Sequence, residues 1–148
     1  MLIVCTVLAT AAPALRGFYA SRRTDDAGAQ LLALVQFARS QAAAEGRVYR
    51  LNLDLSGNTY WLTAQGVTSF EHLSTEFGRT FTLPDGTSVE LEGVGTRPGG
   101  SYISFYPTGL TEAAVIRLTG VLGRVVEVAC QSPTEGFAIS TSPTGGKR

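Results

Sequence analysis

The feature that most constrains the fold is an uncharged apolar run, MLIVCTVLATAAPAL, over residues 1–15. As a helix this run would span about 22 Å, less than the roughly 30 Å hydrocarbon core of a membrane. Three interpretations compete: a signal peptide cleaved near Ala14, a buried core helix, and a membrane helix that continues upstream of this sequence. Signal peptides carry a basic segment ahead of the apolar run, and no basic residue precedes this one.

The segment after this run has the spacing of an amphipathic helix and favours the third interpretation. Thr24 is a candidate N-cap, and Gly46 is a candidate terminating residue. No cluster of turn residues separates the two segments, so we predict one helix of up to about 45 residues, kinked at Pro13. Arg39 and Glu45 fall on its polar side. Its apolar stripe consists of Ala27, Leu31, Leu34, Val35, Ala38 and Ala42, and Arg16, Arg22 and Arg23 precede it.

Beyond Gly46 apolar residues alternate with polar ones, which predicts strands. Residues 48–55 and 59–63 flank the turn 56–58 and form a predicted hairpin. We expect further strands at 80–83, 87–91, 101–106, 113–118, 124–130 and 137–140, with 66–79 as a connection. A helix followed by about seven short strands predicts an α+β fold with an antiparallel sheet. The expected segments are an apolar membrane stem (1–23), the amphipathic half of the helix (24–46) and a β domain with a flexible tail (47–148).

Composition excludes several classes of protein. The 12 basic and 12 acidic residues give a formal net charge of zero, whereas nucleic-acid binding through phosphates needs a basic face. The arginines are dispersed and the one lysine, Lys147, lies in the tail. His72 is the only histidine, so zinc motifs built on a histidine pair are excluded. Two cysteines cannot form a disulfide framework or a four-cysteine metal site.

A direct search for catalytic groups gives one weak candidate. His72 follows Glu71 and has Ser69 and Ser74 close in sequence. A serine–histidine–acid site requires convergence in the fold, and proximity within one loop does not establish it. We therefore interpret His72 as a surface loop residue.

Other candidate sites also have simpler explanations. Glu90 and Glu92, with Asp85 nearby, could hold calcium, but alternating exposed residues on an edge strand account for them. The glycine-rich segment 93–101 lacks the lysine of a phosphate-binding loop. Tyr60 and Trp61 are expected in core and cross-strand packing.

The two cysteines are predicted to be apolar packing residues. Cys5 lies in the apolar run, and Cys130 ends an alternating strand where we expect it to be buried. A disulfide between them would have to join the apolar stem to the β domain, so none is expected.

Several segments together resemble type IV pilin-like proteins, and within these the GspH/FimT group of minor pseudopilins and pilus proteins. They are the uncharged start MLIV, ARSQAAAEGRVYRL (38–51), FTLPDGTSVE (81–90), ISFYPTGL (103–110) and IRLTGVLGRVVEV (116–128). The resemblance covers nearly the whole chain in order and spacing. Members of the group carry a basic leader, a cleavage site and a glutamate just ahead of a run like residues 1–4. We therefore expect these features upstream of the sequence given.

The resemblance implies a minor pilin-like subunit of a type II secretion pseudopilus or a type IV pilus. Such a subunit is anchored in the bacterial inner membrane, with its β domain in the periplasm, and is assembled through helix packing. The implied partners are other minor and major pseudopilins or pilins, the inner membrane, and the prepilin peptidase, which acts on the full-length precursor. The resemblance also implies methylation of the N-terminus that this cleavage creates. We expect no catalytic residue, cofactor or metal, and no nucleic-acid partner.

The residues expected to carry anchoring and packing follow from this interpretation. Assembly through the membrane helix is assigned to Leu2, Ile3, Val4, Val7, Leu8 and Pro13. Packing of the helix on the sheet is assigned to Leu31, Leu34, Val35 and Ala38. The alternative is a secreted β-rich binding or hydrolytic domain whose N-terminal run is a cleaved signal peptide.

Overall fold

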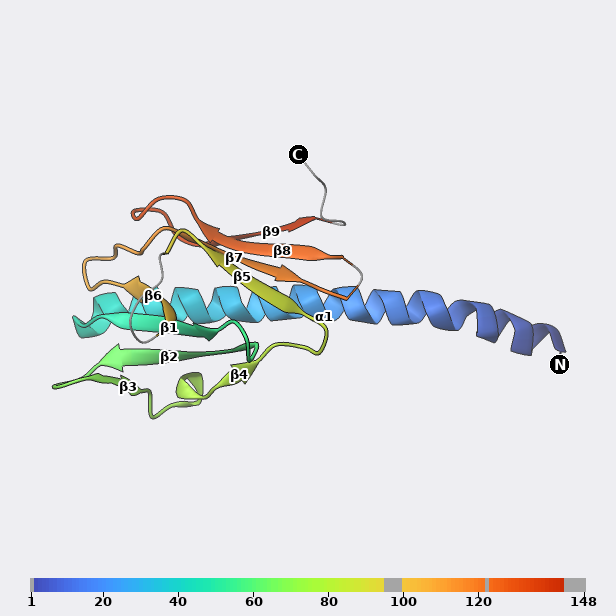
Figure 1. Ribbon diagram of the computed structural model, residues 1–148, viewed down its shortest axis with the longest axis horizontal. Helices are drawn as coiled ribbons and strands as arrows, with labels where there is room; N and C mark the ends of the chain where they lie inside the picture. Colours follow the sequence, from blue (N-terminus) through green and yellow to red (C-terminus); the bar gives the residue numbers. More distant parts are fainter. Residues whose placement is uncertain (1, 95–99, 122, 143–148) are drawn as a thin grey trace.

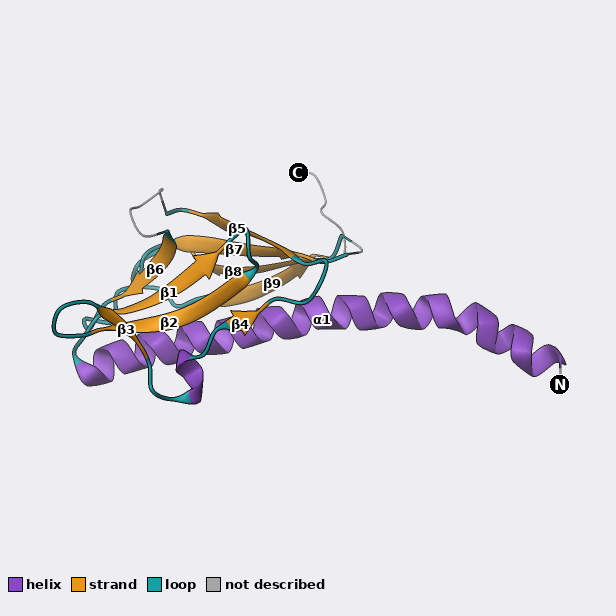
Figure 2. Cartoon of the chain, turned by 60° about the horizontal axis from the view of Figure 1, so that its bottom comes forward, coloured by secondary structure: helices purple, strands orange, loops and turns teal. Residues whose placement is uncertain are grey.

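The computed structural model describes the backbone over residues 2–94, 100–121 and 123–142, and within these ranges it describes the side chains of residues 22–141. One helix, α1 (Leu2–Glu45), runs without interruption for 44 residues. At 1.5 Å per residue it is about 66 Å long. The helix continues through Pro13, and Figure 2 shows it bending toward its N-terminus. The predicted continuous helix is therefore confirmed.

The two ends predicted for the amphipathic half have different outcomes. Gly46 ends the helix as expected: its φ is 67°, and its N–H donates to the Ala42 carbonyl at 3.0 Å. The N-cap prediction for Thr24 is wrong, because Thr24 lies inside the helix and is 1% exposed. A threonine followed by two aspartates marks a helix start only where the preceding residues are not helical, and here they are.

The strands form two antiparallel sheets instead of the single sheet expected. The first has the order β3-β2-β1-β6, and the short β4 also pairs with β2. Its strands are β1 (Tyr49–Asp54), β2 (Thr59–Gln65), β3 (Phe70–His72), β4 (Phe81–Thr82) and β6 (Ser101–Phe105). The second has the order β5-β7-β8-β9 and consists of β5 (Ser88–Glu92), β7 (Ala114–Thr119), β8 (Val125–Cys130) and β9 (Ala138–Ser142).

Pairing between distant strands explains why one sheet was predicted and two are found. The chain leaves the first sheet after β4, enters the second as β5, and returns as β6 to pair with β1. Alternation within a strand shows which residues are buried and does not show which strand is the neighbour. Likewise β3 and the short 3-10 helix η1 (Glu76–Gly78) lie within 66–79, a segment predicted as a plain connection.

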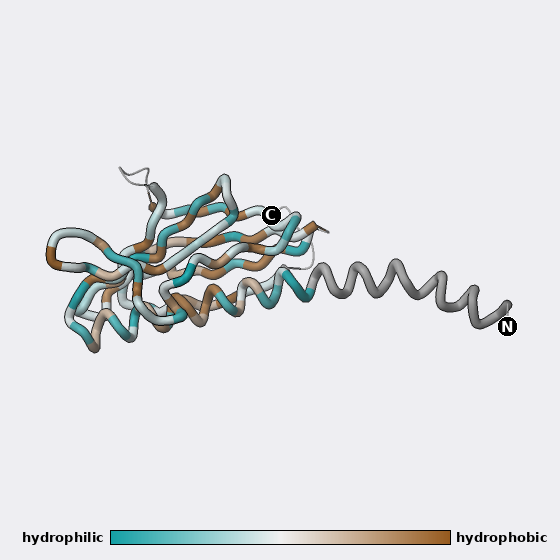
Figure 3. The backbone as a smooth tube through the Cα atoms, turned by 90° about the horizontal axis from the view of Figure 1, so that it is seen from below, coloured by the Kyte–Doolittle hydropathy of each residue, from teal (hydrophilic) through white to brown (hydrophobic). Residues whose placement is uncertain are grey.

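Helix α1 lies along one side of both sheets, and its N-terminal part projects beyond them (Figures 1 and 2). It contacts β1 and β6 of the first sheet and β7, β8 and β9 of the second. Gly28 permits a close approach of the helix to β8, because a Cβ at this position would collide with Val126. Figure 3 shows hydrophobic and hydrophilic residues alternating along the strands, so that one face of each sheet contributes to a common core with the helix.

Candidate functional site

The stripe of α1 is the central feature of the folded domain. Leu31, Leu34, Val35 and Ala38 are 1%, 3%, 1% and 0% exposed, and Ala27 and Ala42 are buried with them. They join one core cluster with residues of both sheets. At about 1.5–3 kcal/mol for each buried leucine or valine side chain, these contacts fix the helix firmly on the β domain. The side chains of Leu2, Ile3, Val4, Val7, Leu8 and Pro13 lie outside the described residues.

Arg39 holds two loops against the helix, although the helical pattern placed it on the solvated side. Its Nε donates to the Gly109 carbonyl at 3.1 Å, and its Nη2 donates to the Thr134 carbonyl at 3.3 Å. Both acceptors are turn carbonyls far away in sequence, so no local pattern could have identified them. The expectation that Arg39 is simply solvated is therefore wrong.

The end of the β domain near residue 24 is attached to the helix by an ion pair. Arg124 donates to both carboxylate oxygens of Asp25, at 2.9 Å from Nε and 2.8 Å from Nη2. The hydrogen bonds to Asp25 raise the pKa of the Arg124 guanidinium. Paired donors of this kind set orientation as well as attraction. Thr24, the neighbouring residue, is buried against Gly120, where a Cβ would collide with the threonine hydroxyl.

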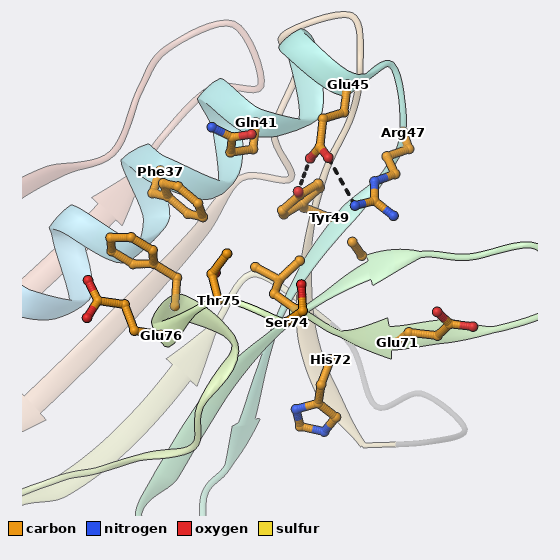
Figure 4. A pocket seen from close by; sticks show the side chains of 13 residues that line it. Phe37, Gln41, Glu45, Arg47, Tyr49, Glu71, His72, Ser74, Thr75 and Glu76 are labelled. Atoms are coloured by element: carbon orange, nitrogen blue, oxygen red, sulfur yellow. Dashed lines mark hydrogen bonds and ion pairs between the residues drawn. The ribbon is translucent and has the colours of Figure 1, made fainter.

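A pocket of about 620 Å³ lies between the C-terminal end of α1 and the β2–β3 region (Figure 4). Glu45 accepts hydrogen bonds from the Tyr49 hydroxyl and from Arg47, the latter at 3.0 Å. The Tyr49 hydrogen bond, with a smaller contribution from Arg47, lowers the pKa of Glu45. Burial, with the Glu45 hydrogen bond, raises the pKa of Tyr49. The three groups satisfy one another, an arrangement that stabilises the helix end and leaves no activated nucleophile among them.

His72 lies on the outer face of the first sheet. Its ring stacks on Trp61 with centroids 6.2 Å apart, and its Nδ1 is 3.2 Å from the Gly78 carbonyl oxygen. Figure 4 shows the ring directed away from Ser74. The structure therefore does not bring these two groups together as a nucleophile and its base. Contrary to the loop interpretation, His72 belongs to strand β3.

Tyr60 and Trp61 make the core and cross-strand contacts expected of them, Tyr60 inside the core and Trp61 on His72 of the neighbouring strand β3. Tyr60 is 2% exposed and stacks on Phe81 with centroids 5.3 Å apart, and burial raises its pKa to about 12. Trp61 points to the opposite face of β2 because successive side chains of a strand alternate. On that same outer face the Arg50 guanidinium lies over the rings of Phe70 and Tyr102, at 3.5 and 4.3 Å from their centroids.

The acidic residues of β5 form an ion-pair network. Arg117 contacts Glu90 at 3.2 Å, Glu92 at 2.9 Å and Glu127 at 2.9 Å across three neighbouring strands. Its hydrogen bonds to Glu92 and Glu127 raise the pKa of this guanidinium. The β5 strand is at the edge of the second sheet, as expected. Arg117 occupies the carboxylates that a calcium ion would need, and the described residues contain no group of three or more potential metal ligands.

The remaining candidates lie partly outside the described residues. Cys130 is a free thiol, 1% exposed, and its Sγ lies 3.0 Å from the Ser132 carbonyl and 3.2 Å from the Glu135 carbonyl. Burial raises its pKa. The side chain of Cys5 and residues 95–99 of the glycine-rich segment are not described. Within the part of the chain that is described, no helix is long and apolar enough to cross a membrane.

Comparison with known proteins identifies relatives of the fold. A family model described as Type II transport protein GspH matches residues 27–145. A structure of the minor pseudopilin EpsH from the type 2 secretion system of Vibrio cholerae superposes with a TM-score of 0.67 at 11% identity, covering 84% of this chain and 99% of that one. A crystal structure of EpsH gives a TM-score of 0.68 at 10% identity, covering 86% and 99%. No curated protein sequence matches the chain.

Proposed function

The chain belongs to the GspH family of type II transport proteins, and we propose that it acts as a minor pseudopilin: a membrane-anchored structural subunit that assembles through its long helix. The predicted family resemblance and the predicted α+β fold, one helix packed on antiparallel strands, are confirmed. Anchoring, assembly and the choice between a type II pseudopilus and a type IV pilus are parts of the proposal.

The observation that carries the proposal is the division of α1 into two parts with different surroundings. From Thr24 to Glu45 the helix contributes its stripe to the core of the β domain. Before Thr24 it projects beyond both sheets (Figure 1), and its sequence over residues 1–15 is free of charge. An apolar segment that projects from its domain needs another apolar environment, which a bilayer or a bundle of neighbouring stems provides.

The rest of the molecule fits a structural role. Several of its described ionisable groups are engaged in pairs that hold elements together, as at Asp25–Arg124, Arg117–Glu127 and Glu45–Tyr49. We propose that the β domain lies in the periplasm, that the stem lies in the bacterial inner membrane, and that other major and minor pseudopilins are the partners. A precursor would be processed by the prepilin peptidase and methylated at its new N-terminus.

The proposal is tested by placing a charge in the stem. Val7→Arg in the protein expressed from its complete gene puts a cation in the apolar run, at a cost of about 2.5–3.5 kcal/mol at the centre of a membrane helix. We expect it to abolish both membrane retention and secretion. Val7→Leu keeps the segment apolar and should retain both. His72→Ala should also retain both, because the contacts of the ring with Trp61 and with the Gly78 carbonyl oxygen are structural.

Mass spectrometry of the membrane and soluble fractions distinguishes a membrane-anchored subunit from a secreted domain. Retention of residues 1–15 in a membrane-bound mature protein supports the proposal. A soluble mature protein that starts near residue 14 would instead support a secreted domain with a cleaved signal peptide. Loss of activity in His72→Ala together with full activity in Val7→Arg would refute the assembly proposal.

A further inference from the structure

The turn between β7 and β8 exposes an apolar side chain at the end of the β domain from which the stem projects. Val121 lies in this turn and is 66% exposed. It lies beside a second turn, because a Cβ at Gly86 would collide with the valine side chain. A single exposed valine is common on protein surfaces and needs no explanation. The position of Val121 relative to the stem is the significant feature.

Two contacts fix the position of this turn along the helix axis. On one side of Val121, the Gly120 backbone rests directly on Thr24. On the other side, Arg124 is held by Asp25 through two hydrogen bonds of 2.9 and 2.8 Å. Both contacts are made at neighbouring helical positions, so the turn cannot move along the helix without breaking them. Val121 is therefore held close to the point where the stem leaves the β domain (Figure 1).

The sequence of the stem places this point near a membrane surface. Residues 18 and 19 are phenylalanine and tyrosine, and aromatic residues of membrane helices gather at the interface. Thr24 follows Tyr19 by five positions, a rise of about 8 Å along the helix. Each headgroup layer is about 5–8 Å thick, so the turn beside Thr24 would lie at its outer boundary. A helix tilt of about 20°, the average for membrane helices, is enough to lower one side of the domain into that layer.

We propose that Val121 makes a second contact with the membrane, resting in the headgroup layer on the side of the stem occupied by the β7–β8 turn. This inference rests on the proposed function, since it requires the stem to be anchored. With the stem as one point of attachment and the turn as another, the β domain would have a preferred rotation about the helix before assembly. Neighbouring subunits would then meet it with a defined face.

The charges around the turn indicate that this contact depends on apolar burial. Arg22 and Arg23 are exposed on the helix nearby, but Asp26 and Asp85 are exposed at the same end. The two signs balance, so attraction to anionic lipids contributes little. The contact should therefore persist in vesicles of purely zwitterionic phosphatidylcholine.

The test compares two exposed valines at opposite ends of the β domain. Val121→Cys carries an environment-sensitive dye at the turn. Val67→Cys carries it in the β2–β3 connection, and Val67 is 101% exposed. Figure 1 shows this connection at the end of the β domain away from the stem. Both are made in the full chain with Cys5→Ala and Cys130→Ala, after thermal unfolding has verified that the parent folds cooperatively. The protein is reconstituted into phosphatidylcholine vesicles whose headgroups carry a nitroxide quencher, and flotation selects the bound fraction.

We expect the dye at position 121 to lose more emission to the quencher than the dye at position 67. As a measurement without the dye, the thiol at position 121 should react more slowly with a water-soluble maleimide in vesicles than in detergent, while the thiol at 67 should not change. Equal quenching and unchanged reactivity in vesicle-bound protein would overturn this inference and leave the membrane anchor intact. Failure of the chain to float with vesicles would overturn both.

Discussion

Leu34→Ala measures how much the stripe of α1 contributes to the folded domain. Leu34 is 3% exposed, and replacing it by alanine removes about three methylene equivalents, or roughly 2.4 kcal/mol of transfer free energy. A closed cavity would add to this cost. Leu34, however, borders a hollow of about 200 Å³ that is also lined by Phe77 and Phe81, so the vacated volume opens onto it. We therefore expect a loss of about 2–3 kcal/mol in the free energy of unfolding, the lower half of the range for buried leucines.

Urea and thermal unfolding of residues 24–148 provide the assay, with an expected fall in Tm of about 5–12 °C. The matched control is Leu110→Ala, which removes the same atoms from a side chain that is 42% exposed in the turn after β6. It should change the free energy of unfolding by no more than about 0.5 kcal/mol. If Leu34→Ala costs less than about 0.5 kcal/mol, or no more than the control, the helix face has been assigned wrongly.

Three further predictions concern the same domain. Residues 24–148 should form a soluble monomer that unfolds cooperatively, because the core lies within them. Light scattering and calorimetry check these two properties. Aggregation of the fragment would assign residues 1–23 to the core. Cys130 should resist thiol reagents until the protein unfolds. Because burial raises its pKa, its contribution to stability should be complete below the ordinary thiol pKa and lost as pH rises through the raised value. Urea titrations should show a smaller loss of stability with rising pH in Cys130→Ala. Arg39→Ala should speed amide exchange in the turns carrying Gly109 and Thr134, and unchanged exchange there would mean that these hydrogen bonds hold nothing in place.

Local patterns in the sequence were enough to predict the long helix, the spacing of its apolar stripe and most strands. The helix follows from apolar residues at the 3.6-residue period, and Gly46 marks its end because it adopts a positive φ. The β1–β2 hairpin follows from alternation on both sides of a turn, in which Asp54 accepts hydrogen bonds from the Gly57 N–H and the Ser56 hydroxyl. These features depend on neighbours in sequence.

Features that depend on distant partners could not be predicted in this way. Arg39 has the polarity of a solvated residue, and its acceptors are carbonyls 70 and 95 positions away. Thr24 has the pattern of an N-cap, and only the continuing helix and the β7–β8 turn determine that it is buried. The division into two sheets is likewise set by the pairing of β1 with β6 and of β5 with β7.

Separating the β domain from the stem in a cell shows whether this protein functions by assembly through its stem. Residues 24–148 are delivered to the periplasm of a strain lacking the gene by a cleavable signal peptide, and secretion of a substrate is compared with rescue by the full-length gene at equal protein levels. We expect the full-length gene to restore secretion and the folded fragment to fail to do so. Restoration of secretion by the fragment alone would refute assembly through the stem, because the function would then reside in a free β domain.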